Sequence, residues 1–541
     1  MNRKERRAKA SAAPAMGGEA FLQAVQLHRA GRLAEAEALY RQALARQPNF
    51  PEGWFHLGEL YQDAGRLEPA AECYQKSVAQ APGAAEPKHN LATVLSDLGR
   101  REEALALARQ AAAIRPDLAP IQAHLGRLLF LLDRVAEARA PLQKALERDP
   151  DQDEALRTLG VVERHYGRLA QSDALLARRL ARAPDDRVAL LNRAMTLKDM
   201  GRYAEALPLA ERALAQRPQD ADARWHYSHL LLQMGRLEEG WRDFAWRWAM
   251  PSYQGAKRSF RQPAWNGVDD LTDQRVLVWP EQGVGDEITF ASALGDLAAK
   301  AKRVIVECAP KIRPILARSF PDLEFHPADR SRDASRDDFD IHLPVGDLFA
   351  HFRKTIDAFP KRDSYLVADP EKIAHWQGWL ASLGPGQKIG IAWRSTLVTP
   401  ERARHFFQDL SGWGPILQTP GQVFVILQPG ATDDEIKAAE QAFGLAIHRP
   451  PGLDLFDDLD GVAALMAALD RVVGNGSVVT ILSAALGRPT LCFLLRHAHW
   501  DWFGTESLAW IPKLEILARN WDEGWEQAIG KAAARLGGPA T

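Results

Sequence analysis

A 34-residue step runs through the first half of the sequence and limits what this part of the chain can fold into. A Gly-Arg pair recurs at this step, and Asp133-Arg134 fills the one position where the pair is missing. The glycines are Gly31, Gly65, Gly99, Gly167, Gly201 and Gly235, and prolines keep the same step at Pro48, Pro82, Pro116, Pro150, Pro184 and Pro218. Two markers in phase over this length predict a stack of like helical units rather than one globular core.

Each unit has the pattern of two helices joined by a tight turn. In residues 51–84, Leu57 and Tyr61 fall at helical spacing on one face of a first helix. Gly65 ends that helix because the turn needs a residue that tolerates positive φ, and Pro82 closes the second helix. Small residues recur at the expected helix crossing: Gly58, Ala92, Gly126, Gly160, Ala194 and Ser228. A bulky side chain there would push the two helices apart.

This period and layout resemble the tetratricopeptide (TPR) repeat family over residues 17–250, as six full units and a capping hairpin. The resemblance implies a concave groove that holds an extended segment of a protein partner. The aromatic run 241–248 departs from the repeat pattern, and two roles stay open for it: covering the end of the solenoid, and docking the array onto the next domain. The basic residues 1–16 are expected to form a disordered tail.

Composition excludes several classes of protein. The chain has 541 residues, of which 46% are hydrophobic and 26% charged, as in ordinary soluble proteins. A net charge of −2 gives no overall field that favours nucleic acid. The three cysteines, Cys73, Cys308 and Cys492, are far apart and form neither a disulfide framework nor a zinc site. Without a signal-like start or an 18-residue apolar stretch, we expect a cytoplasmic protein with no membrane span.

The periodicity changes after an irregular connector, residues 251–273, which carries aromatic residues and is expected to be packed. A strand at 275–279, a glycine loop, a helix at 287–300 and a strand at 303–308 predict the start of a parallel sheet. Further strands are expected at 388–393, 422–428, 471–474 and 489–495, and helices at 312–319, 460–469 and 477–486. The predicted fold class is therefore an α solenoid followed by two Rossmann-like α/β halves, residues 274–370 and 385–535, which face across a cleft.

Five segments of the second half resemble GT-B glycosyltransferases of the heptosyltransferase-like group. They are residues 279–286, 390–393, 425–428, 470–477 and 485–489. The combination with TPR repeats is similar to protein O-GlcNAc transferases and to flagellin-modifying enzymes. The resemblance implies a glycosyltransferase that moves a sugar from a nucleotide-sugar donor to a Ser or Thr hydroxyl of a protein acceptor, with no cofactor and no metal. The first half would hold the acceptor and the second half the donor.

Asp286 is the catalytic candidate that the resemblance implies, because an Asp after this glycine loop acts as the base in the related enzymes. It follows the first strand, at the sheet edge where open α/β folds bind ligands. The alternative is a cap on a helix that begins near Glu287. Gly283 and Gly285 allow either close approach of a ligand or a tight turn.

Donor-binding candidates follow the strands of the second half. Arg394 and Gln428 end two strands, and Asn475, Gly476 and Ser477 precede a helix whose first N–H groups would bind phosphate. Arg402, Arg404 and His405 in the next loop are further candidates for the phosphate. We expect Asp286 and Ser477 to lie on opposite walls of one cleft.

Two features leave alternatives open. Relatives carry Asp-Thr at Gly476-Ser477 and a His at Ile481, so this chain uses a different donor, such as a CMP-linked acidic sugar, or has lost the activity. In the second case it is a TPR adaptor with an inactive transferase-like domain. A lipid or polysaccharide acceptor would leave the repeats unexplained. Residues 497–502 hold two His and one Asp, which is too few ligands to predict a metal site.

Overall fold

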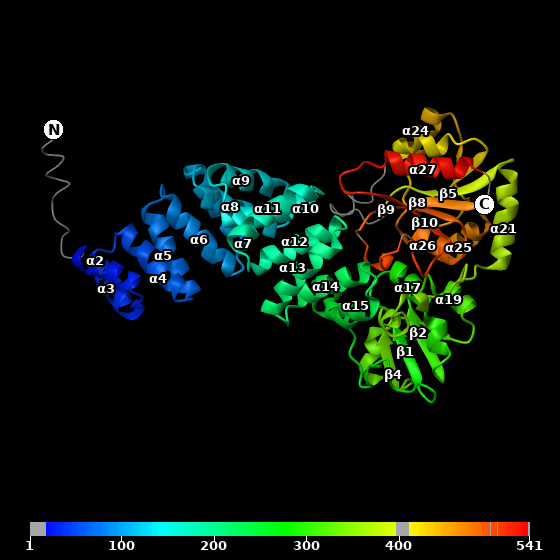
Figure 1. Cartoon of the computed structure of the whole chain (residues 1–541), viewed down its shortest axis with the longest axis horizontal. Coiled ribbons are helices and arrows are strands. Elements are labelled where there is room, and N and C mark those ends of the chain that lie inside the picture. Colours follow the sequence, from blue (N-terminus) through cyan, green and yellow to red (C-terminus); the bar gives the residue numbers. More distant parts are fainter. Residues whose placement is uncertain (1–17, 396–409, 498, 506, 539–541) are drawn as a thin grey trace. The chain divides into compact units, whose positions relative to one another are not determined.

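The computed structural model describes residues 18–395 and 410–538, apart from 498 and 506 (Figure 1). The expected tail, residues 1–16, lies outside the described residues. The chain divides into two compact units, Met1–Arg193 and Ala194–Thr541. The first unit contains helical repeats alone, whereas the second contains the last repeats and both parallel sheets.

The repeats form a long series of antiparallel helix pairs (Figure 1). In the first unit these are α2 (Gly18–Arg29), α3 (Leu33–Arg46), α4 (Pro51–Asp63), α5 (Leu67–Gln80), α6 (Ala85–Asp97), α7 (Arg101–Ile114), α8 (Ala119–Leu131), α9 (Val135–Arg148), α10 (Asp153–His165) and α11 (Leu169–Arg182). The series continues with α12 (Arg187–Asp199), α13 (Tyr203–Gln216), α14 (Ala221–Gln233), α15 (Leu237–Phe244) and the 3-10 helix η1 (Ala245–Ala249). No strand lies among the described residues before β1 (Arg275–Trp279), so the predicted array is confirmed.

The turn glycines explain the sequence period. All six have positive φ, between 71° and 80°, where a side chain would be strained. Asp133, at the fourth turn in chain order, adopts φ 58°, which Asp tolerates better than most residues. At the crossings, a Cβ on Gly126 would lie 2.4 Å from Cγ of Leu142, and one on Gly160 would lie 2.7 Å from Cγ of Leu176. Glycine is therefore needed there for close helix packing.

The aromatic hairpin at the end of the repeats fulfils both roles left open by the sequence. Trp241 is buried, and its indole N–H donates to the carbonyl oxygen of Arg353 at 2.8 Å. Its ring packs edge-on against Phe244 of its own helix and against Trp500 of the last α/β half. The hairpin thus covers the repeat core of the second unit and is anchored to both α/β halves.

The connector after the hairpin is packed, as the sequence predicts. It starts with the short helix α16 (Pro251–Gln254), and Trp265 is 6% exposed. The backbone N–H of Trp265 donates to the carbonyl oxygen of His342 at 2.8 Å. The connector therefore lines the edge of the first sheet.

The first sheet has four parallel strands in the order β3-β2-β1-β4. Beside β1 they are β2 (Arg303–Cys308), β3 (Glu324–Pro327) and β4 (Ile341–Pro344); its helices are α17 (Val284–Ala291), α18 (Leu294–Ala298), α19 (Arg313–Ser319) and α20 (Asp347–Phe352). Two short 3-10 helices, η2 (Arg330–Ser335) and η3 (Ile356–Ala358), complete this half. The helix predicted at 287–300 begins earlier and is interrupted between α17 and α18.

The second sheet has six parallel strands in the order β10-β9-β8-β5-β6-β7. They are β5 (Gln387–Ala392), β6 (Gln422–Ile426), β7 (Ile447–His448), β8 (Arg471–Asn475), β9 (Thr490–Leu495) and β10 (Leu514–Arg519). The helices are α21 (Pro370–Ser382), η4 (Leu410–Trp413), α23 (Gly414–Leu417), α24 (Asp433–Phe443), α25 (Leu459–Ala468), α26 (Val478–Ala485), η5 (Trp500–Trp502) and α27 (Glu526–Gly537). The order places β5 and β8 side by side, so the loops after them lie together.

Candidate active site

A cleft opens where the first helix of one α/β half meets a helix of the other. The start of α17 packs against α26: a Cβ on Gly285 would lie 3.7 Å from Cγ2 of Val478 and 3.9 Å from Cδ1 of Ile481. The cleft has a volume of about 480 Å³, within the range of small-molecule sites. Its polar lining comes from Gly283, Gly285, Asp286, Thr289, Lys311, Arg394, Ser395, Gly476, Ser477, Thr480, His499 and Asp501. Asp286 and Ser477 therefore line the same cleft, as the sequence predicts.

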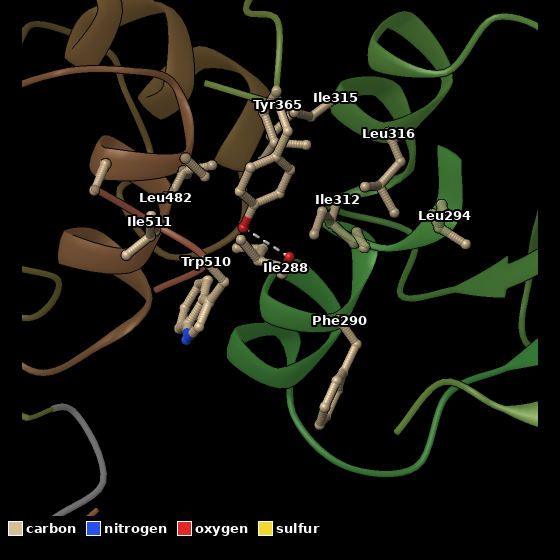
Figure 2. Close-up of a cluster of buried hydrophobic side chains, with 14 of the residues drawn as sticks. Ile288, Phe290, Leu294, Ile312, Ile315, Leu316, Tyr365, Leu482, Trp510 and Ile511 are labelled. Carbon is tan, nitrogen blue, oxygen red and sulfur yellow. Dashed lines mark hydrogen bonds between the residues drawn. The ribbon is translucent and has the colours of Figure 1, made fainter. Parts of the chain in front are cut away.

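An apolar contact behind the cleft joins the two halves. Figure 2 shows Tyr365 between Leu482 of α26 and Ile312 of the first half. The hydroxyl of Tyr365 donates to the carbonyl oxygen of Ile288 in α17 at 2.9 Å, and its backbone N–H donates to the carbonyl oxygen of Ala485 in α26 at 3.0 Å. Burial raises the pKa of this hydroxyl, so it remains a donor. One residue thus fixes the spacing of the two helices whose first turns line the cleft.

Asp286 is the third residue of α17, whereas the capping alternative from the sequence put it directly before the helix. The helix begins at Val284, so the predicted start near Glu287 is wrong. Oδ2 of Asp286 accepts the backbone N–H of Gly283 at 3.3 Å, which gives this carboxylate a capping role. A carboxylate has about four lone-pair positions, so a capping bond does not prevent it from accepting a proton from a bound hydroxyl. The structure therefore accommodates both roles considered from the sequence.

Asp501 is a second carboxylate in the cleft, and it is not among the site residues expected from the sequence. It lies in η5, after β9, and lines the same cavity as Asp286. Burial, together with the nearby charge of Asp286, raises the pKa of Asp501 to about 7. The cleft therefore contains one carboxyl group that is protonated over part of the neutral range. The cluster 497–502 is the signal in the sequence that could have found it, although its residue types point first to a metal.

The start of α26 has the properties of a phosphate site. Gly476 and Ser477 line the cleft with the first turn of the helix. The backbone N–H of Ser477 donates to Oγ1 of Thr480 at 3.2 Å, which fixes the turn. The N–H groups of Val478 and Val479 follow in the first helical turn, where an α-helix supplies no acceptor of its own. These donors and the positive end of the helix dipole favour an anion at this wall of the cleft.

Two predicted donor-binding residues have another role. Gln428 and Asn475 are each 1% exposed and do not line the cleft. The side-chain oxygen of Gln428 accepts the backbone N–H of Arg394 at 2.8 Å, and Nδ2 of Asn475 donates to the carbonyl oxygen of Trp393 at 2.6 Å. Both amides hold the segment after β5, so the prediction that they contact the donor directly is corrected to a positioning role.

The positive groups of the cleft are partly neutralised. Arg394 lines the cleft as predicted, but its guanidinium is paired with Glu435 and donates to the carbonyl oxygen of Gly430 at 2.9 Å. Lys311, which also lines the cleft, lies 3.8 Å from the carboxylate of Asp457 and donates to the carbonyl oxygen of Phe456 at 3.1 Å. The other predicted phosphate ligands, Arg402, Arg404 and His405, lie outside the described residues. Within the described part of the cleft, the helix start at α26 is therefore the main anion-binding feature.

Two kinds of feature are absent from residues 18–395 and 410–538, apart from 498 and 506. No group of three or more His, Cys, Asp and Glu side chains among these residues is arranged to hold a metal ion. No helix in this part of the chain combines the length and the apolar character that crossing a bilayer requires.

Comparison with known proteins agrees with the helical part of the fold. The family model described as Tetratricopeptide repeat matches residues 27–94, 95–159 and 197–240, so this part of the chain carries TPR repeats. Protein FlbA of Caulobacter vibrioides is 35% identical over 316 residues, which cover 55% of this chain and 52% of FlbA. The chain thus spans about half the length of that curated relative.

Solved TPR proteins also align with part of the chain. YrrB, described as a TPR protein with an unusual peptide-binding site, is 20% identical, with a TM-score of 0.30 over 34% of this chain and 95% of YrrB. TTC0263, a TPR protein of Thermus thermophilus, is 27% identical, with a TM-score of 0.28 over 34% of this chain and 98% of TTC0263.

Proposed function

We propose that the protein is a glycosyltransferase of the GT-B type that transfers a sugar from a nucleotide-sugar donor to a Ser or Thr hydroxyl of a protein held by the repeats. The observation that supports this most directly is the cleft itself. Asp286 of the first α/β half and the start of α26 of the second half line it together, so a carboxylate and a helix N-terminus suited to an anion share one cleft. A donor of this class carries phosphate at the leaving group, and its acceptor must lose a proton.

The reaction divides between the two walls. The phosphates of the donor lie against the N–H groups at the start of α26, which stabilise the negative charge of the leaving nucleotide. Asp286 takes the proton of the acceptor hydroxyl as that oxygen bonds to the anomeric carbon of the sugar. The bond from this carbon to the phosphate oxygen breaks, and the nucleotide leaves with the electron pair. The repeats contribute by binding the polypeptide that carries the hydroxyl.

A negative charge introduced at position 477 tests the proposed donor site even though the sugar is not identified. Ser477→Asp keeps a good N-cap for α26 but places a carboxylate beside the proposed phosphates. We expect the dissociation constants of uridine, guanosine and cytidine nucleotides that bind the wild type to rise at least about tenfold. Ser477→Asn is the matched control, because it caps the helix without the charge and should bind nearly as the wild type does. No nucleotide binding by the wild type would instead favour the adaptor.

Asp286→Asn tests the base. Its side-chain oxygen can still accept the N–H of Gly283, so the capping contact and the unfolding temperature should persist. We expect transfer to fall about 10²–10⁴-fold, because an amide cannot take the proton, while nucleotide and acceptor binding remain. Transfer at the wild-type rate by a normally folded Asp286→Asn protein would show that another group is the base.

A further inference from the structure

A second cavity, of about 340 Å³, lies between the last repeats and the segment that follows β9. We define it by ten residues that line it: Tyr203, Gln233, Arg496, His497, His499, Trp502, Gly504, Thr505, Ile516 and Ala518. All of them belong to the second compact unit. The cavity shares His499 with the cleft, but Asp286 and the start of α26 do not line it.

The walls of this second cavity are held in place from both sides. The amide Nε2 of Gln233, at the end of α14, donates to the carbonyl oxygens of His497 and His499, each at 3.0 Å. The hydroxyl of Tyr203 lies 2.7 Å from Nδ1 of His497. Two residues of the segment have positive φ, His497 at 62° and Phe503 at 51°. Such conformations persist only where surrounding contacts determine them, so the cavity is a built feature of the fold.

Two polar groups of the second cavity are buried and unsatisfied within the part of the chain that the structure describes. Oε1 of Gln233 and the indole N–H of Trp502 are buried and have no hydrogen-bond partner among the described residues, and the two side chains belong to residues that are 2% and 8% exposed. The guanidinium of Arg496, a half-buried residue that lines the cavity, forms no ion pair with a carboxylate in the described part of the chain. A buried donor or acceptor without a partner destabilises the fold, so the indole N–H of Trp502 and Oε1 of Gln233 are candidates to bind a ligand in the cavity.

Arg496 is the charged residue among the described residues that line the second cavity, and the nearby carboxylate of Asp199, whose charge reaches His497, is paired with Lys198 at 2.8 Å. None of its ten lining residues is Asp or Glu. Burial first, and then the positive charge of Arg496, lower the pKa of His497, so this imidazole is neutral near pH 7. The positive charge of Arg496 helps to lower the pKa of Glu523, but the carboxylate of Glu523 already accepts hydrogen bonds from the backbone and side-chain N–H groups of Asn520. The cavity thus presents the guanidinium of Arg496 and the indole N–H of Trp502 to an anion, with Oε1 of Gln233 as an acceptor.

We propose that the second cavity binds a carboxylate with an amide N–H beside it, the chemistry of an acidic residue in a polypeptide and of a free N-acylated acidic amino acid. Arg496 pairs with the carboxylate, the indole N–H of Trp502 donates to a ligand oxygen, and Oε1 of Gln233 accepts the amide N–H. The inference does not depend on sugar transfer. If the protein transfers a sugar to a protein acceptor as proposed, an acidic residue of that acceptor lies next to the cleft, because His499 lines both cavities.

Binding of blocked peptides to the full chain tests this proposal. The probes are N-acetyl-Ala-Asp-Ala-amide, its Asn counterpart, and free N-acetyl-aspartate, followed by ligand-observed NMR titration. We expect the Asp peptide to bind at least about tenfold more tightly than the Asn peptide, because only the former pairs with Arg496. Equal binding of free N-acetyl-aspartate would identify a small metabolite as the source of this chemistry, and binding of the peptide alone would identify a polypeptide.

Two variants assign the binding to the second cavity. Arg496→Gln should weaken the Asp peptide at least about tenfold, and Trp502→Phe should weaken it a few-fold, since it removes only the indole N–H. Arg535→Gln is the control: it makes the same charge change at an exposed arginine of α27 paired with Glu515, and should bind as the wild type does. Unfolding temperatures confirm that each variant is folded. Equal affinity for the Asp and Asn peptides, no binding of either, or full binding by folded Arg496→Gln would overturn the inference, whether or not sugar transfer is found.

Discussion

Arg247→Met should destabilise the second unit by an amount that the structure allows us to work out. Arg247 is completely buried, and its guanidinium contacts Glu281 at 2.7 Å and 3.0 Å and Asp347 at 2.6 Å. The side chain of Glu281 is 5% exposed, whereas that of Asp347 is 27% exposed and keeps contact with water. Methionine fills much of the volume but leaves the Glu281 carboxylate buried without its cation. Breaking a buried pair in this way costs about 3–5 kcal/mol.

The pH dependence of this loss has a definite sign. Burial raises the pKa of Glu281, and the charge of Arg247 opposes that shift. Without the arginine the folded-state pKa rises further above its unfolded value. The ionised form is then the unfavourable one, so the stability lost by Arg247→Met is largest at pH 8 and shrinks as Glu281 takes up a proton toward pH 5. The double variant Arg247→Met/Glu281→Gln should recover most of the loss at pH 8, because no buried charge remains.

Urea unfolding followed by tryptophan fluorescence is a suitable assay. All tryptophans except Trp54 lie in the second unit, so the signal reports on the part that contains Arg247. We expect the Arg247→Met protein to unfold at clearly lower urea at pH 8, and the double variant to unfold close to the wild type. A loss below about 1 kcal/mol at pH 8, or a double variant no more stable than Arg247→Met, would refute the assignment of the cost to the unpaired Glu281.

Three further substitutions should alter stability in stated directions. Gly126→Ala should destabilise the first unit by about 1–3 kcal/mol in thermal or urea unfolding, because its Cβ would lie 2.4 Å from Cγ of Leu142. Gly378→Ala, at an exposed helix position with open space around it, should instead stabilise α21 by up to about 1 kcal/mol. A loss of stability of similar size in both variants would contradict the packing argument. Asp501→Asn should raise the unfolding temperature only a little above that of the wild type at pH 5 and clearly more at pH 8, because a carboxyl whose folded-state pKa is raised from 3.8 to about 7 destabilises the fold increasingly as pH rises between those two values. A pH-independent difference between Asp501→Asn and the wild type would show that the carboxyl is not buried as described.

The repeats were predictable because their markers carry backbone requirements. A turn with positive φ favours glycine, so a glycine recurs at each period of the sequence. The exception is Asp133, and Asp is among the residues that tolerate this conformation. The buried parallel strands were predictable for a similar reason, as they form short apolar runs between turn residues. The helix α21 and the strand β10 were among the elements missed: α21 begins at Pro370 and runs through the stretch between the two predicted halves, and β10 alternates in burial at the edge of the sheet.

The candidate site was predictable only as far as its backbone position. Sequence places Gln428 and Asn475 near strand ends, where ligands bind, but it does not show that their amides turn inward to hold the segment after β5. It also places Asp286 at the first helix without showing that the carboxylate both caps the helix and lines the cleft. Asp501 reaches the cleft because the segment after β9 is held against the last repeats, a long-range contact that no local pattern encodes.

The central claim is that Asp286 and the start of α26 serve sugar transfer to protein, and intact-mass analysis of acceptor proteins tests it most directly. Proteins that co-purify with the full chain are co-expressed with the wild type, with Asp286→Asn, or without either, and their masses are compared. We predict a discrete increment the size of a hexose or a nonulosonate on a Ser or Thr residue with the wild type, and none with Asp286→Asn. Unmodified acceptors in the presence of a wild-type protein that binds both them and nucleotides would contradict the claim and identify the chain as an adaptor.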